Sequence, residues 1–178
     1  MQTIPFDPDD EPPSTGNSPD RLHFLKVLEK KVLWLSTWMI HHANHIREGD
    51  GELKVGGHQA SCASMVTIMT ALYFAVLKPE DRVAVKPHGS PVFHAIQYLF
   101  GKQDKDHLAR FRALGGAQSY PSRTKDSDDV DFSTGSVGLG VAMTSFAALI
   151  QDYLEAHSWR SSRSRMVCVL GDAELDEG

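Results

Sequence analysis

The chain has 178 residues, of which 41% are hydrophobic and 23% are charged, as in globular rather than disordered or collagen-like proteins. Its 18 basic and 23 acidic residues give a formal net charge of −5, which argues against general electrostatic binding of nucleic acid. The amino terminus lacks the apolar region of a signal peptide, and no run approaches the roughly 20 apolar residues of a membrane span. Both cysteines lie in apolar runs without ligand-like spacing, so we expect reduced, buried thiols and a cytoplasmic protein.

Residues 1–20 differ in composition from the rest of the chain. They contain five prolines and five acidic residues, but no Lys, Arg or His. Such a segment is unsuited to a helix or a core, so we predict a disordered arm that serves a partner rather than the fold. Residues 21–178 then make up the folded domain.

Apolar spacing and breaker residues predict the elements that follow. Asp20 is the expected N-cap of the first helix. In chain order we expect helices over about 21–48 and 56–77, a strand over 82–86, helices over 91–100 and 104–114, a loop over 115–135, a helix from about 140 to 157 and a strand over 166–170. Strands that alternate with long helices predict an α/β fold, with a parallel sheet flanked by helices.

The carboxyl ends of the two predicted strands are candidate ligand sites, because parallel sheets bind ligands beyond those ends. One strand leads to His88 and the other to Asp172. A carboxylate that emerges from a buried strand into a glycine-flanked turn is suited to a divalent cation. A solvated acidic turn is the alternative, and it stays open on spacing alone.

The segment from Thr134 to Gly140 is a second candidate, because glycines allow close backbone approach and helix-start amides attract phosphate. It matches neither a Walker A loop nor a dinucleotide fingerprint. Tight helix packing explains its glycines equally well. His58 and His88 both fall at predicted helix starts, where a neutral imidazole is favoured, so each is a candidate hydrogen-bond donor. Taken singly, such histidines are more often structural.

The order of the motifs is more specific than any one of them. In chain order they are Gly-Gly-His58-Gln-Ala-Ser, Pro-His88-Gly-Ser-Pro, Ser119-Tyr120-Pro-Ser, Phe132-Ser-Thr-Gly135-Ser-Val-Gly-Leu-Gly140 and Gly171-Asp172-Ala-Glu-Leu-Asp-Glu177-Gly178. This order resembles the amino-terminal, diphosphate-binding domain of the transketolase-like thiamine diphosphate enzymes. Within them it is most similar to the homodimeric pyruvate dehydrogenase decarboxylating component. The resemblance covers residues 21–178.

The resemblance implies roles for particular residues. Asp172 matches the ligand of the Mg²⁺ (or Ca²⁺) that bridges the cofactor phosphates, and the backbone of Gly171 and Ala173 matches diphosphate contacts. The family usually has Gly at the position of Ala173, which is acceptable only where φ is negative. The remaining matches are Gly135, Ser136 and Val137 beside the cofactor rings, His88 near the diphosphate, His58 near reacting oxygens and Tyr120 in the substrate-side wall.

The implied function is decarboxylation of a pyruvate-like 2-oxo acid and transfer of the acyl unit to lipoamide. Ketol transfer between sugar phosphates, as in transketolase, and a non-catalytic assembly subunit are the alternatives. The chain ends inside the metal-binding motif, so we expect a domain incomplete at its carboxyl end and inactive alone. The implied partners are a polypeptide with the pyrimidine-binding domain, a second copy in a homodimer of the complete enzyme and an acyltransferase core docked through residues 1–20.

Overall fold

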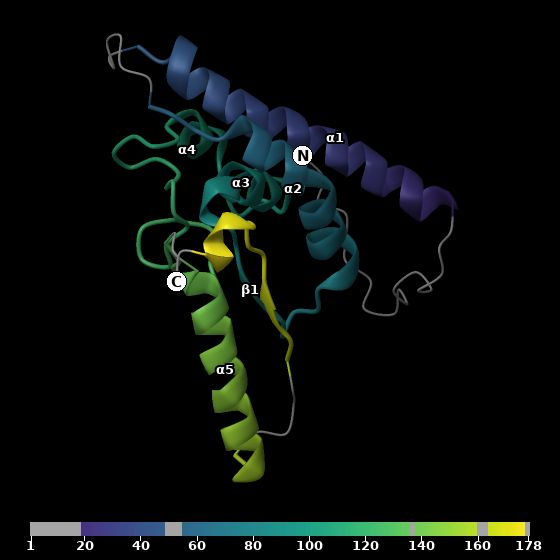
Figure 1. Ribbon diagram of the computed structural model, residues 1–178. Coiled ribbons are helices and arrows are strands. Elements are labelled where there is room, and N and C mark those ends of the chain that lie inside the picture. The colour runs from purple at the N-terminus through teal and green to yellow at the C-terminus, as the bar shows by residue number, and fades with distance from the viewer. Residues whose placement is uncertain (1–18, 49–54, 136–137, 160–163, 177–178) are drawn as a thin grey trace.

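A computed structural model describes residues 19–48, 55–135, 138–159 and 164–176 (Figure 1). The elements in chain order are α1 (Pro19–His41), η1 (His42–Ile46), α2 (Gln59–Ala71), η2 (Leu72–Val76), β1 (Arg82–Ala84), η3 (Pro87–Gly89), α3 (Ser90–Leu99), α4 (Lys105–Ala109), α5 (Leu139–Ala156), β2 (Met166–Cys168) and η4 (Ala173–Leu175). β1 and β2 pair in parallel, with Arg82 opposite Met166 and Ala84 opposite Cys168. Within the described residues the fold is therefore α/β, with a small parallel sheet, as predicted.

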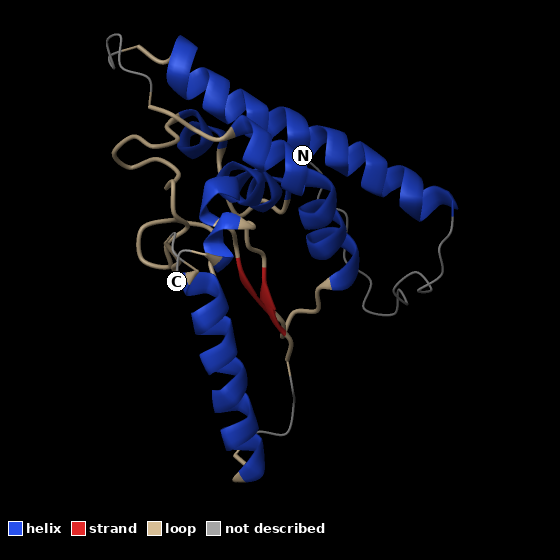
Figure 2. Cartoon of the chain, viewed as in Figure 1, coloured by secondary structure: helices blue, strands red, loops and turns tan. Residues whose placement is uncertain are grey.

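The two-stranded sheet lies between helices (Figure 2). Alternate side chains along its strands face the helices on opposite sides. Val83 and Val85 belong to the core formed with α1, α2 and α3. Ala84 and Cys168 point to the other face, where a Cβ on Gly140 of α5 would lie 3.3 Å from the Ala84 Cβ and 3.2 Å from the Cys168 Sγ. Small residues at this contact let α5 approach the strands closely.

Helix α1 is amphipathic, as its spacing predicts. Val32, Met39 and Ile40 are at most 2% exposed and face α2 and α3. The helix begins at Pro19, so Asp20 lies in its first turn and is not the N-cap that the sequence predicted. Proline is favoured in the first turn because it needs no backbone donor there. Residues 1–18 of the predicted arm lie outside the described residues.

Helices α2 and η2 form one apolar segment, Gln59–Val76, which is long and apolar enough by composition to cross a membrane. It includes Gln, Ser and Thr residues, so it is not an uninterrupted run of roughly 20 apolar residues. Cys62, Met65 and Met69 on this segment are buried in the core against α1 and α3. A helix that packs in this way serves the core of the described fold.

The polar helix predicted over 104–114 is shorter than expected. Asp104 is its N-cap and accepts a hydrogen bond from the His107 amide, but α4 ends at Ala109. Arg112 takes a left-handed conformation with φ 62°, and its N–H donates to the carbonyl of Ala117 instead of continuing the helix. From 115 to 135 the chain forms turns and irregular structure, which confirms the predicted loop.

Candidate functional site

The parallel pairing brings the carboxyl ends of β1 and β2 to one edge of the sheet. We call this edge, formed by residues 85–88 and 169–172, the carboxyl edge. The Val169 amide donates to the Ala84 carbonyl, which keeps the two chains paired just past the strands. His88 and Asp172 therefore leave the sheet at the same edge, where α/β proteins bind ligands.

His58 and His88 lie side by side, although they are 30 positions apart in the sequence. His58 is the residue before the first turn of α2, and His88 lies in η3, directly after the carboxyl edge. Their ring centroids are 4.5 Å apart. Partial desolvation lowers the pKa of His58, and the nearby positive groups His88, Arg112 and Lys86 lower it further. A neutral His58 near pH 7 can donate a hydrogen bond to a substrate oxygen.

Lys86 is a site residue that sequence reasoning missed. Its Nζ lies 2.8 Å from the position that a Cβ on Gly171 would occupy. Among the described residues no carboxylate forms an ion pair with Lys86. Its only sequence signal is its position, two residues after β1, where a lysine usually indicates a solvated strand end. The structure instead places its positive charge at the carboxyl edge, where it favours an anion.

The acidic turn after β2 is ordered by one of its own carboxylates. The Gly171 amide donates to Glu174 Oε2 at 2.6 Å, and Glu174 is buried. Asp172 and Ala173 are exposed. Ala173 does not have a positive φ, so the condition for Ala at this position is met. Asp172 is free to meet a cation at the surface, whereas the Gly171 amide would have to leave Glu174 to contact a diphosphate.

The glycines of the 134–140 segment have different structural roles. Gly138 adopts φ 70° as the residue before α5, and Gly140 allows the close contact between α5 and the strands. The tight-packing interpretation therefore holds for Gly140. Gly135 is less crowded: a Cβ placed there would make only an ordinary van der Waals contact among the described residues, with Leu139 Cδ1 at 3.7 Å, which leaves its backbone a candidate for ligand contact. Ser136 and Val137 lie outside the described residues.

Tyr120 lies on the 115–135 loop, and its side chain is 46% exposed. Among the described residues no hydrogen bond or ring contact joins Tyr120 to His58 or His88. The structure thus brings the two histidines, Lys86 and the Gly171–Asp172 turn to one edge, and leaves Tyr120 at the surface of its loop.

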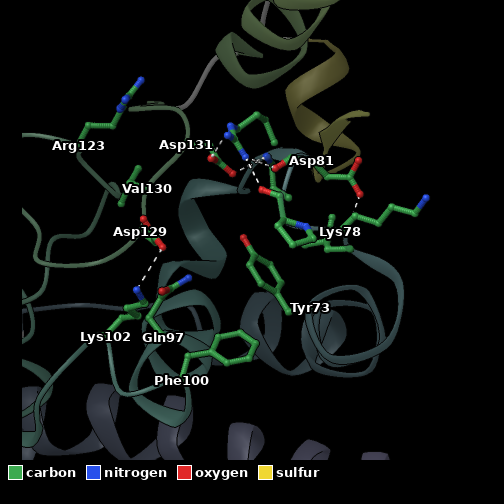
Figure 3. A pocket seen from close by; sticks show the side chains of 14 residues that line it. Tyr73, Lys78, Asp81, Gln97, Phe100, Lys102, Arg123, Asp129, Val130 and Asp131 are labelled. Atoms are coloured by element: carbon green, nitrogen blue, oxygen red, sulfur yellow. Dashed lines mark hydrogen bonds and ion pairs between the residues drawn. The ribbon is translucent and has the colours of Figure 1, made fainter. Parts of the chain in front are cut away.

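A cavity of about 640 Å³ opens at the opposite, amino end of β1 (Figure 3). Its basic groups are partly neutralised by its own acids, because Arg82 Nε lies 3.4 Å from Asp131 and Lys102 Nζ lies 3.8 Å from Asp129. None of the residues that the sequence singled out lines this cavity. The carboxyl edge, where Lys86 forms no ion pair with any described residue, is the stronger candidate for an anion.

No protein-family model matches the chain. Searches among curated proteins found pyruvate dehydrogenase E1 components. The chain is 30% identical to that of Mycolicibacterium smegmatis over 158 residues, which is 82% of this chain and 16% of the relative. It is 27% identical to that of Escherichia coli K12 over 187 aligned positions, which is 99% of this chain and 20% of the relative. A mouse transketolase-like protein 2 is 30% identical over 68% of this chain and 20% of its own length.

This chain is similar to part of the pyruvate dehydrogenase E1 components. It spans about a sixth to a fifth of the length of these relatives. The E1 similarity covers the carboxyl edge, since the alignment with the Escherichia coli relative takes in 99% of the chain. The resemblance of the motifs, drawn from residue patterns alone, thus agrees with whole-chain similarity.

Proposed function

We propose that this chain is the diphosphate-binding part of a thiamine diphosphate- and Mg²⁺-dependent enzyme that decarboxylates a pyruvate-like 2-oxo acid and passes the acyl unit to lipoamide. The observation that carries the proposal is the meeting of Lys86, His88 and the Gly171–Asp172 turn at one sheet edge. Similarity to E1 components supports the reaction class. The relative named transketolase-like protein favours a second candidate, ketol transfer between sugar phosphates.

The residues at the carboxyl edge fit such a cofactor. The exposed carboxylate of Asp172 is a hard oxygen ligand of the kind that Mg²⁺ or Ca²⁺ takes. Lys86 adds a positive charge for the diphosphate, and Gly171 has no side chain to obstruct it. When bound, thiamine diphosphate supplies a carbanion for attack on a carbonyl and a ring that stores the released electron pair.

The side chains around this edge have separate tasks in the proposal. His58 and His88 donate hydrogen bonds to the substrate oxygen on which charge develops. We assign the cofactor rings to the backbone of Gly135 and, from the motif resemblance alone, to Ser136 and Val137. Tyr120 lies on the loop that we assign to the substrate side.

We further propose that the chain works with another polypeptide, or another copy, that supplies the pyrimidine-binding domain. An apolar stripe on α5 supports this. Its residues, 36–65% exposed, recur at intervals of four and three positions: Leu139, Met143, Phe146, Ile150 and Tyr153. A stripe with this spacing is suited to packing against another helix. We expect the chain alone to bind cofactor weakly and to turn over no 2-oxo acid.

Isothermal titration calorimetry with thiamine diphosphate and Mg²⁺ tests the cofactor site, with native mass spectrometry to report partners and stoichiometry. In the assembly that restores the complete domain, Asp172→Asn should lower the Mg²⁺-dependent affinity at least about tenfold. Asp176→Asn, in the same exposed turn, is the matched control and should change it little. Equal affinities for Asp172→Asn and the unaltered chain would refute the metal assignment. Robust pyruvate decarboxylation by the 178-residue chain alone would refute the need for a partner.

A further inference from the structure

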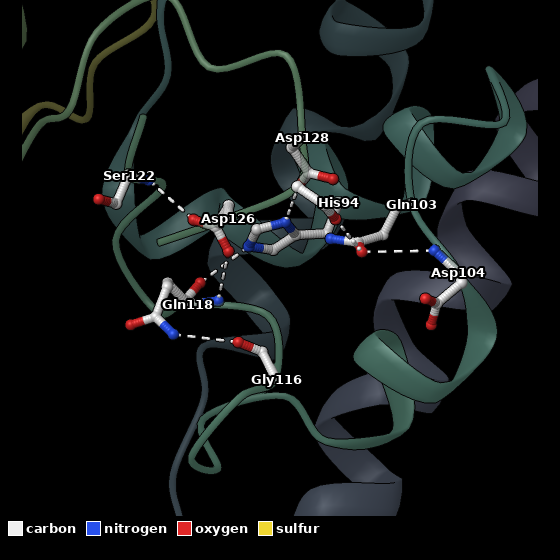
Figure 4. A network of polar contacts seen from close by, with 9 residues as sticks. His94, Gln103, Asp104, Gly116, Gln118, Ser122, Asp126 and Asp128 are labelled. Atoms are coloured by element: carbon white, nitrogen blue, oxygen red, sulfur yellow. Dashed lines mark hydrogen bonds and ion pairs between the residues drawn. The ribbon is translucent and has the colours of Figure 1, made fainter. Parts of the chain in front are cut away.

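The long 115–135 loop is fastened to the helical layer through a buried histidine of α3 (Figure 4). His94 and Asp128 both have side chains that are 0% exposed. His94 Nδ1 is hydrogen-bonded to Asp128 Oδ2, and Nε2 lies 2.8 Å from the Gln118 carbonyl oxygen. One imidazole thus contacts the loop at two points ten residues apart.

The two partners of His94 determine how many protons the pair holds. A peptide carbonyl only accepts hydrogen bonds, so Nε2 must carry a proton. The hydrogen bond between Nδ1 and Asp128 needs a second proton, whether it resides on the nitrogen or on the carboxyl oxygen. If that proton is lost, a ring lone pair faces a buried carboxylate, which is repulsive in a site without water.

The surroundings of the pair favour keeping the proton. Burial alone would lower the pKa of His94, but the hydrogen bond and charge of Asp128, the charge of Asp126 and the Gln118 carbonyl raise it above its ordinary value. From α3 and the segment after α4, the uncharged rings of Phe93 and Phe111 pack on the imidazole.

Asp126 and Asp128 are the charged groups that face His94 from the loop. From η2, the partly buried Tyr73 interacts with Asp128, and desolvation together with Asp131 and Asp128 raises the pKa of Tyr73. Tyr73 is therefore neutral where His94 titrates. No basic group contributes to the shift of His94, so the acids of the loop and the Gln118 carbonyl together favour its charged form.

A metal ion is the alternative for this cluster, since His94, Asp126 and Asp128 offer ligand atoms within 4.8 Å of one another. Most of the donor set is already used, and among the described residues only Asp128 Oδ1 of this cluster has no hydrogen-bond partner. Both ring nitrogens have partners, and the two Asp126 oxygens accept from the Gln118 and Ser122 amides at 3.0 and 2.8 Å. An ion would have to displace these hydrogen bonds, so the geometry favours a shared proton.

We propose that His94 is a positioning residue whose proton, shared with Asp128, holds the 115–135 loop against α3, and that loss of this proton releases the loop. The loop carries Tyr120 and leads into Thr134, whose hydroxyl donates to the Val85 carbonyl at the carboxyl edge. We call the contacts of His94 with the Asp128 carboxyl and the Gln118 carbonyl the clasp. That the clasp matters for a substrate wall depends on the proposed function. The existence of the clasp depends only on the fold.

The direct test is NMR on the full chain with ¹⁵N-labelled histidine, combined with amide hydrogen exchange from about pH 7 to 10. Nε2 of His94 should stay protonated throughout. The His94–Asp128 pair should lose its proton well above the range of the exposed histidines. In the same pH interval the protection factors of the Ser122 and Val130 amides should fall about tenfold. Titration of His94 near its ordinary pKa, or release of the pair's proton without loss of loop protection, would overturn the proposal.

Two variants distinguish loss of the His94–Asp128 contact from a general loss of stability. Asp128→Asn removes the charge with little change of shape, and should lower the pKa of His94 and the protection of Ser122 at pH 7. Asp104→Asn is the control, because the Asp104 side chain pairs with the half-buried His107 at 2.9 Å, and neither side chain makes a hydrogen bond to the 115–135 loop among the described residues. If Asp128→Asn fails to fold, the titration of the unaltered chain still decides.

Two further measurements distinguish the remaining explanations. Stoichiometric shifts of the His94 signals on addition of Zn²⁺ or Mg²⁺ would identify a metal centre and overturn the shared proton. Calorimetry with thiamine diphosphate and Mg²⁺, made on the assembly that restores the complete domain, tests the proposed function separately. Loop release in the chain, together with no cofactor binding by that assembly, would leave the clasp standing and the proposed function refuted.

Discussion

Lys86 and Gly171 occupy adjoining space at the carboxyl edge: a Cβ on Gly171 would lie 2.8 Å from Lys86 Nζ and 2.9 Å from its Cε. The two residues follow different strands, Lys86 after β1 and Gly171 after β2, and the position of each depends on the other. The absence of a side chain on Gly171 lets the ammonium group of Lys86 lie close to the backbone before Asp172. The lysine contributes in turn to the lowered pKa of His58.

Removing the charge of Lys86 should therefore change His58. In Lys86→Met the pKa of His58 should rise toward its ordinary value, because one of the positive groups that oppose its protonation is gone. NMR titration of the His58 ring signals measures this. Lys102→Met is the control, since Lys102 lies near Asp129 and does not act on His58. An unchanged or lower pKa of His58 in Lys86→Met would contradict the placement of Lys86.

Gly171→Ala should leave the stability of the fold nearly unchanged but should displace Lys86 at the carboxyl edge. The clashing atoms are the end of a flexible side chain, so the lysine can swing away and the Tm should change by less than about 3 °C. The displaced ammonium should raise the pKa of His58, as in Lys86→Met. A large loss of Tm would show that Lys86 cannot move.

Gly116→Ala should be far more damaging, because the obstacle is backbone. A Cβ at this position would lie 1.9 Å from the Arg110 carbonyl oxygen. The chain after α4 would have to shift, at a cost of about 3 kcal/mol or more. Chemical denaturation measures the loss. Gly135→Ala, which meets only Leu139 Cδ1 at 3.7 Å, should leave the free energy of unfolding nearly unchanged, and equal effects of the two variants would contradict the packing.

Asp81 should make the fold sensitive to acid. Its carboxylate accepts from the Arg165 side chain and amide and from the Lys78 amide. The Arg165 hydrogen bond is the main cause that holds the pKa of Asp81 far below its usual range. A carboxylate whose pKa is depressed on folding contributes stability above its unfolded pKa, and this contribution is lost as the pH falls toward the folded pKa.

The stability of the unaltered chain should therefore fall from about pH 5 downward, and Asp81→Asn should remove part of that dependence. At pH 7 the variant should melt roughly 5 °C lower, since the Lys78 turn and β2 lose a common partner. Thermal unfolding at several pH values checks both. Asp129→Asn, in an exposed pair 3.8 Å long, should leave the pH profile unaltered.

The spacing of residues along the chain correctly predicted those features of the fold that depend on local sequence pattern. The buried face of α1, the parallel strands and the turn after each strand follow from alternation, period and breaker residues. Residue pairings that depend on tertiary packing could not be predicted in this way. Asp128 lies 34 positions after His94, and a histidine in an apolar helix is typical of an ordinary core residue. The early end of α4 depends on Arg112, because an arginine gives no signal of a left-handed backbone.

The two thiols should differ in reactivity. Cys62 is buried, as predicted, and desolvation raises its pKa to about 12. Cys168 is only half-buried, which corrects the prediction for that residue. Both are free, so a chromogenic disulfide reagent should modify Cys168 first and Cys62 only with unfolding. Cys168→Ser should leave a single slow thiol; a fast reaction in that variant would contradict the burial of Cys62.

The small sheet has a consequence for the order of folding. Asp81 and Arg165, which join the starts of the two strands, are 84 residues apart in sequence, whereas α1, α2 and α3 follow one another closely and share a core. Closing a long loop costs entropy before any strand pairing compensates for it, so the helical layer should form first and β2 should dock last, together with α5. The elements that dock last should also be the first to open in the native protein. We therefore expect β2 and α5 to open first and to be the region that a protease cleaves first.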